Sequence, residues 1–361
     1  MAGVTILEHE LSELRLVVER QAGILLDCPN SALAAHVAEY LESHELASTT
    51  ALLEHLGAAD QDPALLPAFL DGVLNINTGF FRHPGAMNAL AKCIVPQLYA
   101  RKSEDGPCTL RIWSAGCATG EEAYSIAMAL CDVLPLGNGN ANGNGASANG
   151  NGAKEKSAAG RNGIIAENST PAAIAQGTRD WSVHIVGSDL LRSAIEIAER
   201  GLYPQSALAG LPPATIRACF TKIGNVGAGQ NGSNGNLSDG NSSGAANAST
   251  AGSNNAPCGS TYLLVKPRLR SLVTFNTMNL IKPVYIGRFD CIFCMDVLPH
   301  LSRAQRIALL ERLHLYLEPG GYLFLSQTEK LCTSNLNFRS ETFDGYTFHR
   351  KPMAASAAYG R

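Results

Sequence analysis

The sequence contains few charged and few aromatic residues and no long apolar run, and each absence narrows the class of protein. Charged residues make up 16% and aromatic residues 6% of the 361 residues. No stretch approaches the roughly 20 consecutive apolar residues of a membrane-spanning helix. The first 21 residues lack the basic start and apolar middle of a signal peptide. We therefore expect a cytoplasmic protein without membrane insertion, long enough for one large or two modest domains.

Ten cysteines are present, but their placement does not resemble a disulfide framework. They are scattered singly through apolar segments, which is typical of reduced thiols. Cys291 and Cys294 have the spacing of a zinc-binding pair, yet they lie in an apolar run, residues 289–295, that is typical of a buried strand. Residues three apart on a strand point to opposite faces, and no second pair exists. Core packing is therefore favoured over a metal site, and we expect none.

The net charge of −3 conceals an uneven distribution. Residues 1–71 hold twelve acids and two bases, Arg15 and Arg20, and so carry −10. The remainder holds 19 acids and 26 bases and carries +7. A segment this acidic repels phosphates, so we expect no nucleic-acid partner.

Apolar residues at helical spacing predict a small all-helical domain over residues 1–71. The apolar stripes cover residues 11–26, 33–41 and 52–56. Pro63 and Pro67 interrupt the pattern that follows, which favours a domain boundary near Asp71.

Residues 72–361 form the second expected domain, and two segments within it are rich in Asn and Gly, at about 137–163 and 225–256. Neither can bury enough apolar surface to offset its ordering entropy. We expect both to be disordered insertions at loop tips.

Outside these insertions, strand and helix patterns alternate. The expected strands cover residues 110–113, 183–187, 272–275, 289–294 and 322–326, and the expected helices cover residues 122–134, 190–200 and 303–317. The segment Glu318-Pro319-Gly320-Gly321 is a helix stop and turn signature. This alternation predicts an α/β fold with a mostly parallel sheet.

The turn between the first strand and the first helix of this series is the most informative element. It reads Trp-Ser-Ala-Gly-Cys-Ala-Thr-Gly-Glu-Glu-Ala-Tyr-Ser over residues 113–125. In a doubly wound sheet, such a turn presents backbone N–H groups to a nucleotide-sized ligand. Glu121 and Glu122 stand where a dinucleotide fold faces a pyrophosphate. Carboxylates repel phosphate and suit an ammonium group, so the turn predicts S-adenosylmethionine rather than a nicotinamide cofactor.

Polar residues follow the other strands. Asp189 comes after the strand at residues 183–187 and either accepts hydrogen bonds from a ribose or caps the next helix. Asn279 with Leu280, and Asp296, follow two further strands. These residues either contact an adenine or are ordinary turn residues, and spacing alone leaves both interpretations open.

Arg82 follows two aromatic residues, Phe80 and Phe81, ahead of the sheet. These residues form either a core staple beside a solvated charge or an anchor that directs Arg82 into the ligand site. Arginine is suited to hold a carboxylate with two hydrogen bonds.

Five stretches together resemble the chemotaxis-receptor glutamate methyltransferase family (CheR-type), and they occur in the order typical of that family. They are INTGFFRHP, RIWSAGCATGEEAYSIAMAL, VGSDLLRSAIEIAERGLYP, FNTMNL, and FDCIFCMDVLPHLS with LEPGGYLFLSQTEKL. The resemblance covers roughly residues 12–350. It implies a Rossmann-like S-adenosylmethionine domain after a small helical domain, with a short inserted antiparallel subdomain that can dock a receptor tail. It also implies methyl transfer to a glutamate of a methyl-accepting chemotaxis receptor or similar helical signalling protein.

The resemblance also implies site residues. Donor-binding positions of the family correspond to Thr78, Arg82, Glu122, Asp189, Asn279, Leu280, Met295 and Asp296, and the catalytic candidates are Arg82 and His300. Three departures stand out. Ile76 replaces an Asn, Met295 and Asp296 replace an Arg-Asn pair, and His300 replaces a Tyr near the transferred methyl group. His300 either partly replaces that Tyr or is a surface residue at a helix start.

Three functions remain open at this point: a receptor methyltransferase, a non-catalytic relative that binds the donor, and a methyltransferase of another protein. The family approaches its acidic receptor with an arginine-rich helix, whereas residues 31–46 here contain no Arg or Lys. We therefore expect either a less acidic substrate or docking through the bases Lys266, Arg268 and Arg270.

Overall fold

The computed structural model describes residues 6–57, 65–74, 76–105, 109–134, 181–223, 261–282, 287–331 and 336–353. The two Asn/Gly-rich segments, expected to be disordered at about 137–163 and 225–256, lie outside these residues. Within the described ranges, no helix combines the length and the apolar character needed to cross a membrane.

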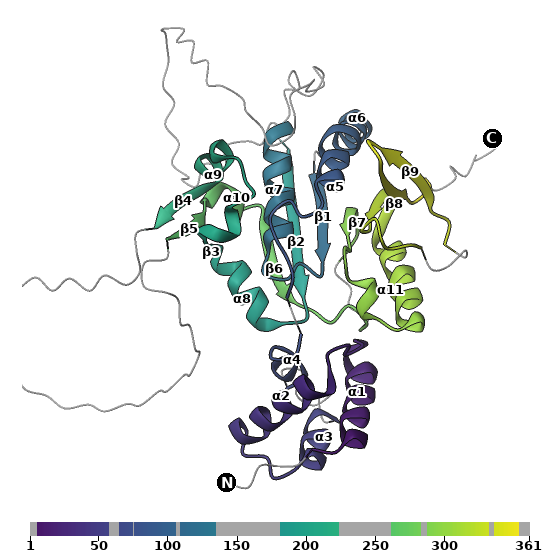
Figure 1. Ribbon diagram of the computed structural model, residues 1–361. Coiled ribbons are helices and arrows are strands. Elements are labelled where there is room, and N and C mark those ends of the chain that lie inside the picture. The colour runs from purple at the N-terminus through teal and green to yellow at the C-terminus, as the bar shows by residue number, and fades with distance from the viewer. Residues whose placement is uncertain are drawn as a thin grey trace, which may run out of the picture.

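The centre of the fold is a seven-stranded sheet with the order β6-β2-β1-β7-β8-β10-β9 (Figure 1). Its strands are β1 Thr109–Ala115, β2 Ser182–Asp189, β6 Val273–Thr277, β7 Phe289–Phe293, β8 Leu317–Phe324, β9 Arg339–Phe343 and β10 Tyr346–Arg350. The first five pair in parallel, and β10 runs antiparallel to both β8 and β9. From β1 the chain proceeds to β2 and β6 on one side and then crosses to β7 on the other. Ligands bind at such a reversal, beyond the carboxyl ends of the strands.

Helices cover both faces of this sheet. They include α5 Pro84–Asn88, the π-helix η2 Ala89–Ile94, α6 Val95–Asp105, α7 Glu121–Val133, α8 Arg192–Arg200 and α11 Arg303–Tyr316. Successive strand residues enter different apolar clusters: Ile112 packs in the cluster that contains α7, and Trp113 in the cluster that contains α11. Cys291 and Cys294 likewise belong to different clusters and are fully buried, as the strand interpretation predicted.

A second, three-stranded antiparallel sheet has the order β3-β5-β4. Its strands are β3 Leu202–Pro204, β4 Phe220–Ile223 and β5 Tyr262–Val265, accompanied by the 3-10 helix η3 Gln205–Leu208 and by α9 Pro213–Cys219 and α10 Pro267–Arg270. The inserted antiparallel subdomain is thus confirmed. The second Asn/Gly-rich segment falls between β4 and β5.

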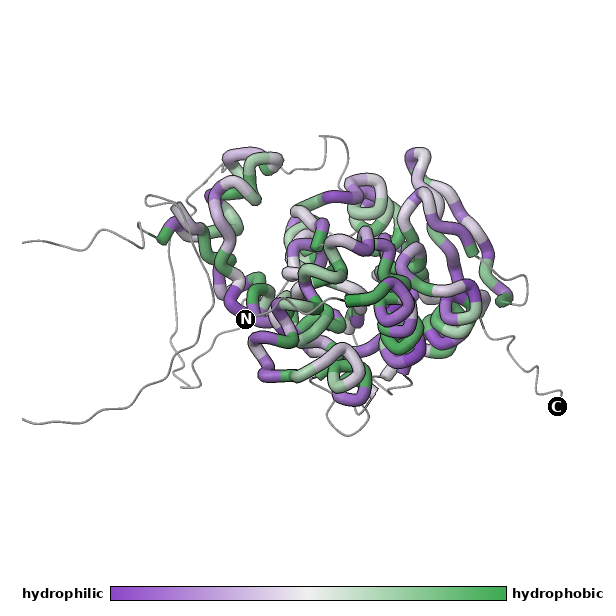
Figure 2. Tube along the Cα trace, turned by 60° about the horizontal axis from the view of Figure 1, so that its bottom comes forward, coloured by the Kyte–Doolittle hydropathy of each residue, from purple (hydrophilic) through white to green (hydrophobic). Residues whose placement is uncertain are grey.

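Four helices precede the sheet: α1 Glu8–Ala22, α2 Asn30–Ser43, α3 Thr49–Gly57 and α4 Leu65–Leu70. Figure 1 shows them grouped below the carboxyl ends of the parallel strands. Along the tube in Figure 2, hydrophobic and hydrophilic residues alternate on the helices. Their common apolar cluster also takes in Leu191 and Ala194 of the α8 region, so these helices share a core with the sheet domain. The helical N-terminal region is confirmed, and the boundary near Asp71 stays a prediction.

Some elements differ from the sequence-based expectation. The helix α4 contains Pro67, which is tolerated because the first turn of a helix needs no N–H donor. The predicted turn after α11 lies inside β8, which begins at Leu317 instead of Tyr322. Gly320 has φ +76°, and its N–H donates to the Lys351 carbonyl at 3.0 Å, so the C-terminal segment holds this irregular stretch. The helical run α5–η2–α6 and the β9–β10 hairpin were not predicted.

Candidate functional site

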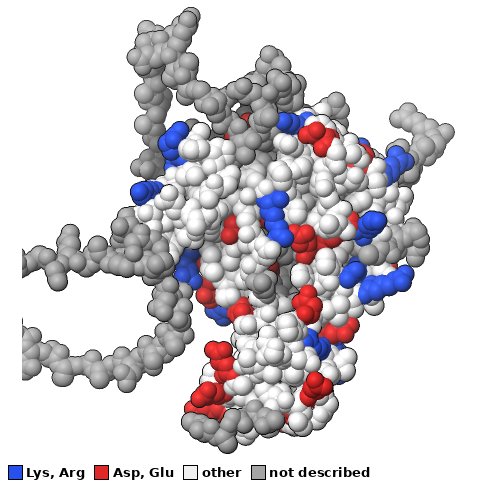
Figure 3. Space-filling model, in the orientation of Figure 1, with Lys and Arg blue, Asp and Glu red and all other residues white. Residues whose placement is uncertain are grey.

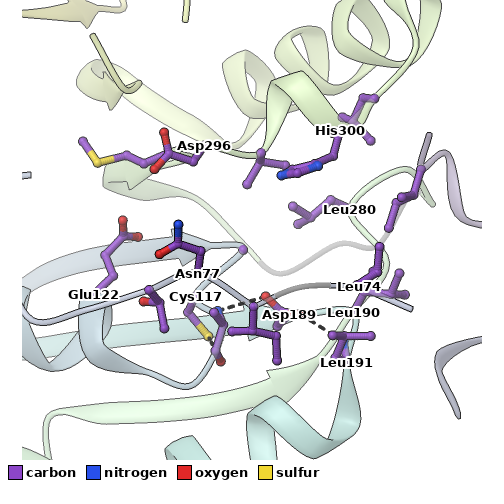
Figure 4. Close-up of a pocket in the computed structure, with 18 of the residues that line it drawn as sticks. Leu74, Asn77, Cys117, Glu122, Asp189, Leu190, Leu191, Leu280, Asp296 and His300 are labelled. Carbon is purple, nitrogen blue, oxygen red and sulfur yellow. Dashed lines mark hydrogen bonds between the residues drawn. The ribbon is translucent and has the colours of Figure 1, made fainter. Parts of the chain in front are cut away.

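A cavity of about 560 Å³ lies at the carboxyl ends of β1, β2, β6 and β7 and reaches the N-terminal helices. All nine of the predicted site residues line it: Thr78, Arg82, Glu122, Asp189, Asn279, Leu280, Met295, Asp296 and His300. Figure 4 shows Asp296 and His300 on one side of the cavity and Glu122 and Asp189 on the other. The structure therefore brings together residues from separate parts of the sequence, while the role of each one stays a prediction.

The turn after β1 requires glycine at two positions. Gly116 has φ +85°, and a Cβ there would lie 2.5 Å from Cγ2 of Val297. Gly120 has φ +94°, and a Cβ there would lie 2.7 Å from Cβ of Ala198. A side chain would be strained at either position. The backbone of the turn therefore lies close to Val297 and to the helix α8.

The N–H groups of this turn were expected to face a ligand, and that expectation is wrong for residues 116–118. Gly116 and Cys117 donate their N–H groups to the Ser188 carbonyl at 2.8 and 2.9 Å. Ala118 donates its N–H to Oδ2 of Asp189 at 2.9 Å. The end of the adjacent strand satisfies these donors, so recognition at the turn depends on side chains.

Of the two glutamates in the turn, only Glu122 lines the cavity. Its Oε1 accepts a hydrogen bond from Oγ of Ser114 at 2.6 Å. Its position deep in the protein raises the pKa of its carboxyl to about 7. Glu121 instead accepts a hydrogen bond from Oγ1 of Thr119 at 2.7 Å and is buried away from the cavity. Glu122 is thus the carboxylate available to an ammonium group.

Asp189 joins the loops that follow β1 and β2. Besides the Ala118 N–H, it accepts the N–H of Leu191 at Oδ1, 3.0 Å away (dashed lines in Figure 4). Burial raises the pKa of its carboxyl, although the backbone hydrogen bonds oppose that shift. Asp189 is not the N-cap of α8, because Leu191 occupies that position. The ribose role stays a prediction.

Two aromatic residues anchor the turn that carries Arg82. The Phe80 ring packs edge-on against Tyr203 and Phe220, with centroids 5.0 and 5.4 Å away. Phe81 adopts φ 52° and donates its N–H to Oγ of Ser125 at 2.9 Å. This arrangement matches the interpretation in which the aromatic pair directs Arg82 into the cavity.

Asp296 lies between two bases. Its Oδ2 is 3.2 Å from Nη2 of Arg82 and 2.9 Å from Nε2 of His83. Its backbone N–H donates to Oε2 of Glu329 at 3.2 Å, and the N–H of Leu298 donates to Oε1 of the same residue at 2.9 Å. Glu329 therefore fixes the loop that presents Asp296 to Arg82.

Backbone strain accompanies this site. Five non-glycine residues in the described part of the chain have positive φ, and three of them line the cavity: Phe81, Ala118 and Asp296. Such conformations cost free energy and persist where the surroundings enforce them, commonly at functional sites.

Leu280 and His300 lie on the side of the cavity away from Glu122, as Figure 4 shows. Asn279 uses its amide within the protein, accepting the N–H of Ile281 at 3.0 Å and donating to the Gln21 carbonyl at 3.3 Å. The turn-residue interpretation of Asn279 is therefore observed. His300 is exposed at the end of a 3-10 turn, η4 Leu298–His300, and not at the start of α11.

Four residues of this network were not predicted: His83, Ser114, Ser125 and Glu329. Three of them act through partners 33 to 213 residues away, as His83 does with Asp296, whereas Ser114 bonds Glu122 eight residues further on. A single serine, histidine or acid leaves no periodic pattern in the sequence, so the role of these residues becomes visible only in the folded structure.

Comparison with other proteins finds that the sequence is similar to methyltransferases. The family model described as "CheR methyltransferase, SAM binding domain" matches residues 76–141 and 253–346. A chemotaxis protein methyltransferase of Vibrio parahaemolyticus is 25% identical over 334 residues, covering 92% of each chain. Chemotaxis protein methyltransferase 1 of Pseudomonas aeruginosa is 26% identical over 320 residues, covering 88% of each chain.

Solved structures with some likeness include the glycopeptide N-methyltransferase MtfA complexed with S-adenosylmethionine. It is 12% identical, with a TM-score of 0.26, covering 78% of this chain and 72% of that chain. Magnesium protoporphyrin IX methyltransferase from Synechocystis is also 12% identical, with a TM-score of 0.27, covering 76% of this chain and 84% of that chain. The fold class rests on the strand order and the family match rather than on these low scores.

A doubly wound sheet with an acid-lined cavity at its switch point, matched by a model of a S-adenosylmethionine-binding domain, defines a S-adenosylmethionine-dependent methyltransferase. The chain carries a CheR-type S-adenosylmethionine-binding domain and is similar to chemotaxis protein methyltransferases over about nine-tenths of its length.

Proposed function

We propose that this methyltransferase esterifies glutamate side chains of a methyl-accepting chemotaxis receptor or a similar helical signalling protein. The observation that carries the proposal is Arg82, a cavity-lining guanidinium that is 37% exposed and therefore within reach of a carboxylate from another protein. The names of the relatives support the receptor as substrate.

The cavity fits the methyl donor in size and chemistry. Its volume is within the range of small-molecule sites. We assign Glu122 to the donor's ammonium group, Asp189 to its ribose, and Asn279 with Leu280 to its adenine. We place Thr78, Met295 and Asp296 around the methionine end. When bound, S-adenosylmethionine supplies a methyl group that is attached to a positively charged sulfur. Transfer of this methyl group to a carboxylate oxygen breaks the carbon–sulfur bond and leaves the sulfur as a neutral thioether.

The residues of this chain chiefly position the reactants. A glutamate carboxylate is ionised near neutral pH and needs no general base. Arg82 would hold the glutamate carboxylate in place. His300, which is exposed, would lie where the glutamate enters the cavity. Holding two reactants in line is worth on the order of 7–11 kcal/mol.

The charge distribution favours docking through the antiparallel subdomain. Its described residues, 201–223 and 261–272, contain five bases and no acid. The bases are Arg217, Lys222, Lys266, Arg268 and Arg270. The N-terminal helices are acidic, as the red side chains at the bottom of Figure 3 show, with blue side chains around the antiparallel sheet at the upper left. An acidic receptor surface therefore complements the subdomain and not α2.

The seven cysteines in the described residues are free thiols. This state supports a cytoplasmic location, where thiols stay reduced and where we place the proposed reaction.

The test is methylation of a receptor cytoplasmic fragment with methyl-labelled S-adenosylmethionine. We expect label that alkali releases as methanol, as from a methyl ester, and that is lost when the acceptor glutamates are replaced by alanine. Alkali-stable label would indicate another acceptor group. Label on other cellular proteins alone would favour a different substrate. Donor binding without any transfer would identify a non-catalytic relative.

A further inference from the structure

The connection between α1 and α2, residues 23–29, forms a wall of the cavity, and we name it the strap. The cavity-lining residues of the strap are Ile24, Leu26, Asp27, Cys28 and Pro29. The sheet domain alone therefore does not enclose the cavity, because part of the acidic N-terminal region closes it.

The strap and the end of α1 before it are attached to the sheet domain at two points. Near the catalytic candidate His300, the N–H of Leu25 donates to the His300 carbonyl at 2.7 Å, and Ile24 forms a β-bridge with Leu301. At the adenine end, Asn279 donates to the carbonyl of Gln21, just before the strap. Both attachments therefore lie on the side of the cavity where Figure 4 shows Leu280 and His300, away from Glu122.

Arg15 holds the strap from the opposite side. Its guanidinium donates to the carbonyls of Leu26 and Cys28, the latter at 2.6 Å, and to Oδ1 of Asn30 at 3.0 Å. Between its two ends, over residues 24–28, the strap is not helical. Hydrogen bonds from a charged donor are among the stronger ones in proteins. Arg15 is one of only two bases in the first 71 residues. Its position beside the strap is therefore not explained by a generally basic surface.

We propose that the strap is part of the methyl-donor site and that Arg15 is its positioning residue. The inference rests on the proposed donor site. Its consequence is that the N-terminal helices take part in donor binding: a donor in the cavity contacts the strap, and the strap keeps its shape through Arg15. Arg15 acts through the strap and does not itself line the cavity.

The test replaces Arg15 in the full-length protein and measures binding of S-adenosylhomocysteine by calorimetry, at a temperature where each variant is fully folded. We expect Arg15→Gln to weaken binding about tenfold, the loss typical of a charge-assisted hydrogen bond. Arg20→Gln is the matched control, because Arg20 lies exposed on the same helix and does not line the cavity. We expect wild-type affinity for that variant.

Hydrogen exchange separates positioning from general stability. In the wild type we expect S-adenosylhomocysteine to slow amide exchange in residues 24–28, and we expect this protection to be lost in Arg15→Gln. A purely structural role would lower the melting temperature without changing ligand-induced protection or affinity. Asn30→Ala is the milder second variant if Arg15→Gln does not fold, with an expected loss of about threefold that is not additive with the Arg15 change.

Wild-type affinity in the Arg15 and Asn30 variants, or equal weakening by Arg20→Gln, would overturn the inference. The proposed donor site fails separately, if Asp189→Ala and Glu122→Ala both bind S-adenosylhomocysteine as the wild type does.

Discussion

Arg82 and Asp296 form an ion pair in the cavity, with Nη2 and Oδ2 3.2 Å apart. The guanidinium proposed to hold a substrate carboxylate therefore already faces a carboxylate of the protein. The pair is about one-third exposed on each side, so water screens it and an incoming carboxylate has access.

Replacing Asp296 with Asn should make Arg82 more available to the acceptor. We expect the KM for a receptor fragment to fall about two- to fivefold with little change in kcat, because exposed pairs are worth about 0.2–1 kcal/mol. Steady-state methylation kinetics measure this effect. His83→Gln, which retains the Asp296 charge, should change KM less. A higher KM in Asp296→Asn would show that Asp296 orients Arg82 instead of competing for it.

Donor binding should depend on pH through Glu122, whose carboxyl has a pKa of about 7. An ammonium group favours the ionised carboxylate, so S-adenosylhomocysteine affinity should rise with pH. The expected gain is about tenfold between roughly pH 6 and 8, because proton loss is linked to binding. Calorimetry across this range provides the measurement, and Glu122→Gln should show a flat profile. An equally steep profile in that variant would assign the dependence to another group.

Glu122 should also affect stability, with the opposite trend. Because burial raises its pKa from 4.5 to about 7, the folded protein retains between these pH values a proton that the unfolded chain has already lost. Stability relative to Glu122→Gln should therefore fall as pH rises through this window. Thermal melts of both proteins at several pH values measure the difference between their melting temperatures. A wild type that gains stability relative to Glu122→Gln as the pH rises would contradict the expected ionisation.

Asp189→Ala should weaken S-adenosylhomocysteine binding by about 1.5–3 kcal/mol, the range for a hydrogen bond to a charged group. It also removes the acceptor for the Ala118 and Leu191 N–H groups, so Asp189→Asn, which keeps an acceptor oxygen, should lose less. Asp71→Asn is a matched control, since Asp71 bonds Ser193 nearby but does not line the cavity. Calorimetry that finds all three variants alike would contradict the assignment.

Receptor docking should respond to charge in opposite ways at the two surfaces. On the acidic helix α2, Glu39→Gln with Glu42→Gln should raise kcat/KM for an acidic receptor fragment a few-fold at low salt, because like charges repel. On the antiparallel sheet, Lys222→Glu should lower it, and both effects should vanish at high salt. Methylation assays at two salt concentrations decide the matter. A decrease in the α2 variant would place docking on that helix.

Much of the fold was predictable because its signals are local. The strand-turn-helix pattern at residues 113–125 predicted β1 and α7. The alternation beyond it predicted the parallel sheet, with errors of a few residues at the ends of α8 and β8. The helices α5, η2 and α6 were missed, although the motif INTGFFRHP ends at Pro84, the first residue of α5. The N–H groups of residues 116–118 proved to be bonded to the end of the neighbouring strand β2.

The sequence by itself determined the fold class, the donor and the residues at the strand ends, because periodicity and turn chemistry depend on near neighbours. Only the tertiary structure decided the partners of those residues. Asp296 pairs with Arg82 and His83, and Glu329 holds the loop that carries Asp296. The strap closes the cavity beside His300. These contacts join residues far apart in the chain, and no local pattern encodes them. They form where the parallel strands end at one edge of the sheet.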